Sequence, residues 1–252
     1  MIDDPTFYIA AVPAVVLAGL SKGGFGGGIA LLGVPIMALV ISPVQAAAIM
    51  LPILILMDMI ALVAWRGVYD RRSLGILIPA AIVGISAGWA TAAIVTAVHV
   101  RLIVGVVALA FWLDYMLGGA KSLKPRNHNA PKGWVWGAVS GFTSFVSHAG
   151  GPPFQMYMLP LRLEPRLLAG TAIVYFAFVN AFKVVPYLLL GQFSPANLMT
   201  SAVLLPIAPL ATLAGVRLVR IVPQALFYRV TYSVVLVVAA KLIWDGLNGL
   251  LA

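Results

Sequence analysis

The sequence predicts an all-α integral membrane protein built from two inverted-topology repeats, and three observations support this prediction. The 252 residues are 62% hydrophobic and only 9% charged, with a mean hydropathy of +1.06, more apolar surface than a soluble protein of this size buries. The apolar runs are continuous rather than alternating, so they predict helices, which satisfy their own backbone in lipid. A glycine-rich interruption also occurs twice, at corresponding places in the two halves.

The two interruptions are related by a register shift of about 122 residues. They read Ser21-Lys22-Gly23-Gly24-Phe25-Gly26-Gly27-Gly28 and Ser144-Phe145-Val146-Ser147-His148-Ala149-Gly150-Gly151-Pro152-Pro153. The same shift superposes residues outside the interruptions: Gly19 on Gly141, Pro43 on Pro165, Asp58 on Asn180 and Trp65 on Tyr187. The pattern indicates a tandem duplication with an N-terminal repeat at 1–120, a cytoplasmic linker at 121–132 and a C-terminal repeat at 133–252.

Each half contains five hydrophobic segments, so the second half is expected to enter the membrane from the opposite side. The short segments after the glycine breaks would cover only about 21 Å and about 15 Å as helices. Each break therefore belongs either to a full crossing or to a re-entrant hairpin, and the inverted relation holds in both cases. The ten segments are 7–20, 28–41, 44–65, 74–97, 102–118, 133–147, 152–161, 167–190, 197–216 and 223–244.

The basic residues lie almost entirely on one side of this arrangement. Positively charged loops stay in the cytoplasm, so both termini are expected on the periplasmic side of an inner (plasma) membrane. The same bias accounts for the net charge of +9, and nucleic acid is not an expected partner. The opposite loops hold only Arg101, whereas 12 of the 16 Lys and Arg residues share the first side: Lys22, Arg66, Arg71, Arg72, Lys121, Lys124, Arg126, Lys132, Arg162, Arg166, Arg217 and Arg220.

The glycine breaks are candidate anion-binding elements. A helix that restarts after each break, near Gly28 and near Pro152, presents free N–H groups and the positive end of its dipole. Lysine, histidine and hydroxyl side chains add further donors there. Two plainer interpretations stay open, because glycines also serve close helix packing and Lys22 also fits the cytoplasmic charge bias. The expected substrate-binding residues are Ser21, Lys22, Gly26, Gly27, Gly28, Ser144, Ser147, His148, Gly150, Gly151, Asn180 and Lys183.

Asp58 is the expected coupling residue. An ionisable side chain inside a membrane segment is costly, so it is usually functional. Asp58 is therefore a candidate proton carrier or a partner for Lys22, with a structural hydrogen bond to a neighbouring helix as the alternative. Lys183 lies one turn after Asn180, where it either shares the face of Asn180 or snorkels toward the outer surface.

These motifs resemble a known family. The run Gly19-Leu20-Ser21 through Gly28 resembles the first repeat of the TauE/SafE sulfite-exporter family, and Gly141-Phe142-Thr143-Ser144 with His148 through Pro153 resembles its second repeat. Gly170-Thr171, Asn180, Lys183, Tyr187 and Gly191-Gln192 extend the resemblance. It implies a bacterial inner-membrane permease for anions, with sulfite and organosulfonates as the associated substrates. Lys22 stands where a glycine is usual, and His148 with Pro152-Pro153 replaces a plainer glycine run.

The expected function is secondary transport of small sulfur-containing anions by alternating access around a midplane site formed by the two hairpin tips. An anion channel is the alternative that the sequence separates least from a carrier. An accessory membrane subunit has no reason to keep two symmetric polar breaks. An intramembrane enzyme is disfavoured because the adjacent Ser147 and His148 would point in different directions on one helix.

No cofactor or metal is expected, since the sequence has no cysteine and its three histidines are scattered. The expected partners are a small anionic substrate and the lipid bilayer, and the sequence is compatible with a homo-oligomer.

Overall fold

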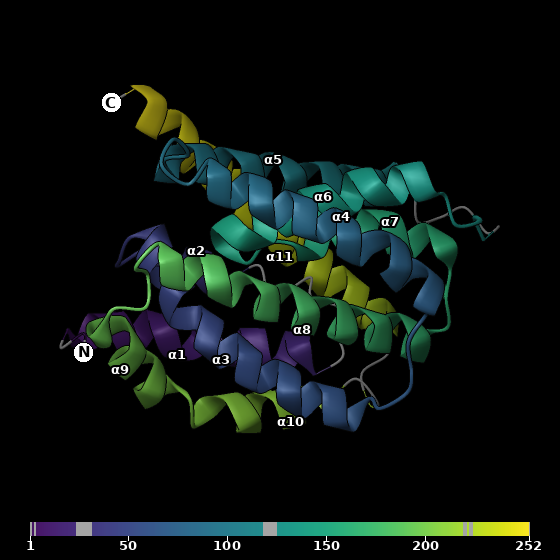
Figure 1. Ribbon diagram of the computed structural model, residues 1–252, viewed down its shortest axis with the longest axis horizontal. Helices are drawn as coiled ribbons and strands as arrows, with labels where there is room; N and C mark the ends of the chain where they lie inside the picture. Colours follow the sequence, from purple (N-terminus) through teal and green to yellow (C-terminus); the bar gives the residue numbers. More distant parts are fainter. Residues whose placement is uncertain are drawn as a thin grey trace.

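The computed structural model of the protein is a bundle of helices (Figure 1). It describes residues 2, 4–23, 32–117, 125–218, 221 and 224–251, and every regular element among them is helical, which confirms the predicted all-α class. The elements are α1 (Pro5–Lys22), α2 (Gly33–Met37), α3 (Pro43–Ala64), α4 (Arg71–Ala90), α5 (Ala97–Met116), α6 (Ala130–Ser147), α7 (Gly151–Met158), the 3-10 turn η2 (Leu159–Leu161), α8 (Pro165–Leu189), α9 (Pro195–Leu204), α10 (Ile207–Leu218) and α11 (Gln224–Leu251).

Four of the described helices, α1, α3, α4 and α8, are long and apolar enough to cross a membrane. A fifth candidate span combines α9 and α10, which are bent by 47° relative to each other. Pro206 lies in this break, where its missing N–H interrupts the helical hydrogen bonds. The chain is therefore a multi-pass helical membrane protein.

The helices that follow the glycine breaks are short. α2 has 5 residues and α7 has 8, so they extend about 8 Å and about 12 Å, much less than a hydrocarbon core of about 30 Å. The choice between re-entrant hairpins and full crossings stays a prediction, since residues 24–31 of the first arm lie outside the described residues. α1 and α2 form the first hairpin, and α6 and α7 form the second.

Several helices begin with a small polar cap followed by proline. The hydroxyls of Ser42 and Ser194 accept the backbone N–H three residues later, and Pro43 and Pro195 occupy the first helical position of α3 and α9. Proline suits that position because its missing N–H would have no partner there. Asp70 caps α4 in the same way. The hydrophobic segments predicted from the sequence begin one to three residues late at these helices, because the caps and prolines are not part of the apolar run.

The two halves pack on each other reciprocally. α1 of the first half lies along α10 of the second, and α6 of the second half lies along α4 of the first. In the same manner α3 contacts α10 and α8 contacts α4. The corresponding helices α3 and α8 meet each other, as do α5 and α11. Both termini lie at the same end of the bundle, on the left in Figure 1.

Two hydrogen bonds repeat between the halves at the predicted register. The indole Nε1 of Trp65 donates to the carbonyl of Gly23 at 3.1 Å, and the hydroxyl of Tyr187 donates to the carbonyl of Phe145 at 2.7 Å. The 122-residue shift relates the donor Trp65 to the donor Tyr187, and the acceptor Gly23 to the acceptor Phe145. Each bond ties the end of the helix that enters the hairpin tip to the long helix that follows the hairpin.

Two glycines that correspond between the halves allow close helix crossings. A Cβ on Gly19 would lie 2.5 Å from the Cβ of Ala211 on α10. A Cβ on Gly141 would lie 2.2 Å from the carbonyl oxygen of Ala81 on α4. Real Cβ atoms do not approach other atoms so closely, so the packing interpretation of glycine holds at these positions.

Gly141→Ala is expected to destabilise the protein by about 2 kcal/mol or more, because the new methyl group would force α4 and α6 apart. Gly75→Ala on α4 is the matched control. No atom lies within 4 Å of its would-be Cβ, and alanine favours the helix there. Thermal unfolding of the two purified variants measures the difference. Equal unfolding temperatures would contradict the α4–α6 contact.

The described end of the linker docks on both halves. The backbone N–H of Arg126 donates to the carbonyl of Pro160 at 3.0 Å. His128 Nε2 lies 2.9 Å from Asp70 Oδ2 and 3.2 Å from the Ser73 hydroxyl. Partial burial acts to raise the pKa of Asp70, but hydrogen bonds from Ser73 and His128 outweigh it and leave the pKa below its usual value. Residues 118–124 lie outside the described residues.

Candidate functional site

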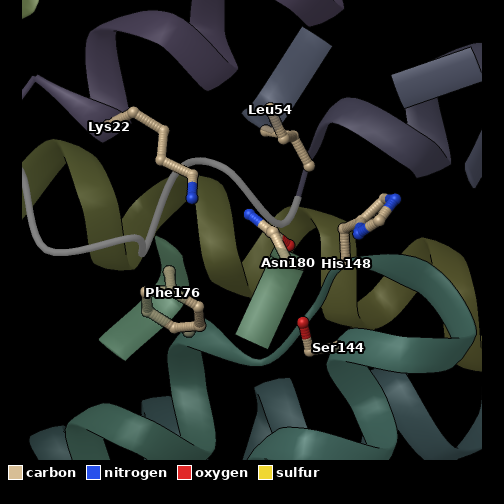
Figure 2. Close-up of a pocket in the computed structure, with 7 residues that line it drawn as sticks. Lys22, Leu54, Ser144, His148, Phe176 and Asn180 are labelled. Carbon is tan, nitrogen blue, oxygen red and sulfur yellow. The ribbon is translucent and has the colours of Figure 1, made fainter. Parts of the chain in front are cut away.

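A buried cavity lies where the second hairpin tip, the end of α1 and the two long helices α3 and α8 come together (Figure 2). It measures about 20 Å³, which is room for a single water molecule. Side chains enter it from both halves of the chain. The lining residues are Lys22, Leu54, Ser144, His148, Gly151, Phe176 and Asn180. We call this space the central cavity.

A three-residue polar cluster lies at the first side of the central cavity. Lys22, the last residue of α1, forms an ion pair with Oδ1 of Asp58 on α3. Asn180 on α8 donates through Nδ2 to the other carboxylate oxygen, Oδ2, at 2.6 Å. All three side chains are buried. The Lys22 ammonium also lies 5.4 Å from the ring centroid of Phe176. Lys22 as the partner of Asp58, one of the two roles expected from the sequence, is the arrangement in the structure.

The central cavity lies at the interface between corresponding parts of the two repeats. Asp58 and Asn180, which contact each other directly, are separated by the repeat shift of 122 residues. The same shift relates Lys22 to Ser144 and Leu54 to Phe176, all four of which line the cavity. One cavity is therefore formed by the same positions taken from both halves.

The second hairpin tip is a tight turn held by side chains. α6 ends at Ser147, and His148 adopts a left-handed backbone conformation with φ of 55°. The turn occupies only His148, Ala149 and Gly150 before α7 begins at Gly151. The hydroxyl of Ser140 donates to the carbonyl of Gly150 at 2.7 Å. A Cβ on Gly150 would lie 2.7 Å from the carbonyl oxygen of Ser140, so glycine is needed for this close approach.

Lys183 clamps the second tip from α8. Its Nζ lies 3.0 Å from the carbonyl oxygen and 3.0 Å from the hydroxyl of Ser144, and 2.7 Å from Nδ1 of His148. The side chain is fully buried, with 0% exposure, so the snorkelling expected as one alternative is wrong. In the charged form all three ammonium protons have acceptors, and none of the three acceptors is a carboxylate.

His148 has both ring nitrogens engaged. Nε2 lies 2.9 Å from the carbonyl oxygen of Ala47, which can only accept, so Nε2 must carry a proton. Nδ1 is the atom that contacts Lys183. His148 therefore has no nitrogen free to donate to an anion in this arrangement, although its side chain lines the central cavity. Its expected role as a direct donor is corrected to that of a residue that fixes the tip.

The remaining predicted residues lie in different places. Gly151 lines the central cavity. Ser147 does not; it lines a second cavity on the other side of the tip. Ser21 is buried, and its hydroxyl has no hydrogen-bond partner within the described part of the chain. Gly26, Gly27 and Gly28 lie outside the described residues.

Backbone donors at the second restarted helix, α7, are fewer than the sequence suggested, and the predicted restart near Gly28 lies outside the described residues. The described helix after the first break begins at Gly33 and has 5 residues, too few to build a strong dipole. At the second break, Pro152 and Pro153 lack an N–H, and the N–H of Phe154 donates to the carbonyl of Gly150. Of the first four residues of α7, this leaves Gly151 alone with a backbone N–H that it could offer to a ligand. Lys22 is the lysine that lines the central cavity, and Asp58 is its ion-pair partner.

Leu54 and Phe176 were missed as lining residues because they look like ordinary apolar positions. Each precedes a member of the Asp58–Asn180 pair by one helical turn, and residues four apart share a helix face. The repeat shift relates Leu54 to Phe176, so the signal was present in the sequence.

The fold and site define a multi-pass helical membrane protein with a buried, lysine-containing cavity between two repeats. A family model described as "Sulfite exporter TauE/SafE" matches residues 11–242. The chain therefore belongs to the TauE/SafE sulfite exporter family, which confirms the resemblance found in the sequence. Membership implies a membrane exporter of sulfite or another anion. No curated protein and no solved structure matches the chain significantly.

Proposed function

We propose that the protein is an inner-membrane secondary transporter of small sulfur-containing anions, such as sulfite or an organosulfonate, and that the anion binds in the central cavity. The observation that carries the proposal is the pair of buried lysines beside a cavity made from corresponding positions of both halves. Asp58 is the only buried carboxylate among the described residues, and it is paired with Lys22. When Lys22 and Lys183 are both protonated, these two lysines and Asp58 together carry one excess positive charge, which an anion would neutralise.

Asp58 is proposed to couple transport to protons. Its carboxylate forms an ion pair with the ammonium group of Lys22. Protonation of Asp58 would weaken that pair and leave the Lys22 ammonium free for the anion. Loss of this proton would restore the ion pair and displace the anion. Asn180, the repeat counterpart of Asp58, holds the second carboxylate oxygen and fixes its orientation.

Alternating access is proposed to open the central cavity to one side at a time. A sulfur oxyanion does not fit in about 20 Å³, so the proposal requires the cavity to widen when the anion binds. The cavity walls come from both halves, and a movement of one half relative to the other would widen it. The reciprocal helix contacts and the repeated Trp65 and Tyr187 hydrogen bonds support two equivalent halves.

The inverted orientation and the periplasmic location of both termini belong to this proposal. The shared position of the termini at one end of the bundle supports it, together with the sequence charge bias. Since the chain has no native cysteine, single cysteines at positions 2 and 127 can be labelled selectively. Position 2 is expected to react with an impermeant thiol reagent on intact cells and position 127 only after permeabilisation. Labelling of position 127 from outside would overturn the orientation.

The function is tested with purified protein in proteoliposomes. Calorimetry and uptake would be measured with sulfite, sulfate, sulfoacetate, isethionate and taurine. We expect saturable uptake of at least one sulfur anion and acceleration by the same anion on the opposite side. Absence of binding and uptake for all sulfur anions would contradict the proposal. Unsaturable flux without counterflow would indicate a channel.

A further inference from the structure

A second cavity lies on the other side of the second hairpin tip. It measures about 230 Å³, far more than the central cavity, and lies between α2, the end of α6, α5 and α11. Its polar residues are Arg101 on α5, Ser147 at the end of α6, and Lys241 and Asp245 on α11. The rest of the lining is apolar, with Leu32 and Leu242 among it. We call this space the outer cavity, because its α5 and α11 residues belong to the end of the bundle that holds both termini (Figure 1).

The second hairpin tip separates the two cavities. Ser147 lines the outer cavity, and the next residue, His148, lines the central cavity. Ser144, one turn earlier on α6, also lines the central cavity. A displacement of this short turn would therefore join the two spaces. The tip is held from α8 by Lys183, which contacts Ser144 and His148, and by Tyr187, which donates to the carbonyl of Phe145.

The charges of the outer cavity favour an anion. Lys241 and Asp245 pair with each other one helical turn apart and so cancel. Arg101 has no carboxylate within ion-pair distance among the described residues. One uncompensated guanidinium therefore faces a largely apolar space. That chemistry suits a ligand with an anionic head and a short apolar body, such as an alkylsulfonate.

We propose that the outer cavity is the vestibule through which the anion passes between the central cavity and the side of the termini, and that Arg101 attracts the anion there. This inference rests on the proposed transport function. The guanidinium acts by raising the local concentration of anions, and the apolar walls accept the alkyl part of an organosulfonate. The second hairpin tip acts as the gate between vestibule and binding site.

Ser147→Cys tests the vestibule, because the native chain has no cysteine to react. The probe is a sulfonate-bearing methanethiosulfonate reagent added from the side of the termini, with a cationic reagent of similar size in parallel. Ala80→Cys is the control, since Ala80 is buried and lines neither cavity. We expect Ser147→Cys to react, Ala80→Cys to stay unmodified, and the transported anion to slow the Ser147→Cys reaction.

Arg101→Gln in the Ser147→Cys background tests the role of charge. We expect the anionic reagent to react roughly 3- to 10-fold more slowly and the cationic reagent to react faster, with both differences shrinking at high salt. An unreactive Ser147→Cys, or an equal effect of Arg101→Gln on both reagents, would overturn the vestibule. Protection by added anionic phospholipid instead of the small anion would assign the cavity to lipid and also overturn it.

The vestibule and the proposed function can fail separately. If anion binding depends on Lys22 but Ser147→Cys does not react, the transport function stands and the vestibule is removed. Charge-selective labelling of Ser147→Cys in a protein that binds no sulfur anion would remove the proposed function and with it the substrate role of the vestibule.

Discussion

Lys22→Met is expected to weaken anion binding roughly 10- to 100-fold and to destabilise the fold at the same time. The substitution removes the cation that lines the central cavity and leaves the Asp58 carboxylate buried with Asn180 as its only described hydrogen-bond donor. Removing one partner of a buried ion pair costs about 3–5 kcal/mol of stability. Separately from this loss of stability, the loss of a charged hydrogen bond to the ligand would weaken the binding free energy by about 1.5–3 kcal/mol, roughly 10- to 100-fold in affinity.

A double-mutant cycle separates the two effects. Asp58→Asn removes the carboxylate and resembles its protonated form, so it is expected to keep anion binding while flattening the pH dependence of transport. The double variant Lys22→Met with Asp58→Asn has no unpaired buried charge at this pair. We expect thermal unfolding close to that of the parent and anion binding, measured by calorimetry, that is still roughly 10- to 100-fold weaker than that of the parent. A double variant that binds as tightly as the parent would show that Lys22 serves only the structure and the charge bias.

The repeat shift explains why the polar cluster could be predicted from the sequence. Asp58 and Asn180 occupy the same position in two halves, and such residues meet only if they lie close to the axis that relates the halves. A single buried carboxylate also needs a cationic partner, and Lys22, in the first glycine-rich interruption, was the partner expected for Asp58. Composition and the continuous apolar runs were sufficient to predict the helices, because lipid leaves few alternatives to a helix.

The geometry of the second tip could not be predicted in the same way. His148 adopts a left-handed conformation, and the direction of a side chain at such a turn depends on backbone angles that Ala149, Gly150 and Gly151 leave open. Ser147 and His148 consequently face different cavities although they are adjacent. The sequence left two alternatives for Lys183, sharing the face of Asn180 or snorkelling outward, and it could not show that the tip supplies three acceptors for a buried ammonium.

Lys183→Met is expected to affect both the tip and the anion, although Lys183 does not line the central cavity. The substitution removes three hydrogen bonds and leaves Ser144 Oγ and His148 Nδ1 buried without their lysine donor. Unsatisfied buried polar groups cost about 1–3 kcal/mol each, so a loss of about 2–4 kcal/mol of stability is expected. The substitution also removes the positive charge that a protonated Lys183 adds beside the Lys22–Asp58 pair, and this loss should weaken anion binding at least 10-fold or so.

Tyr187→Phe is the matched control for this prediction. It removes one neutral hydrogen bond to the same tip, that from the Tyr187 hydroxyl to the carbonyl of Phe145, and changes no charge. We expect a loss of about 1 kcal/mol in thermal unfolding and little change in anion affinity. Affinity measured by calorimetry at a temperature where both variants stay folded decides between the two roles of Lys183. If Lys183→Met binds the anion as well as Tyr187→Phe does, Lys183 only clamps the hairpin, and Lys22 alone provides the positive charge of the site.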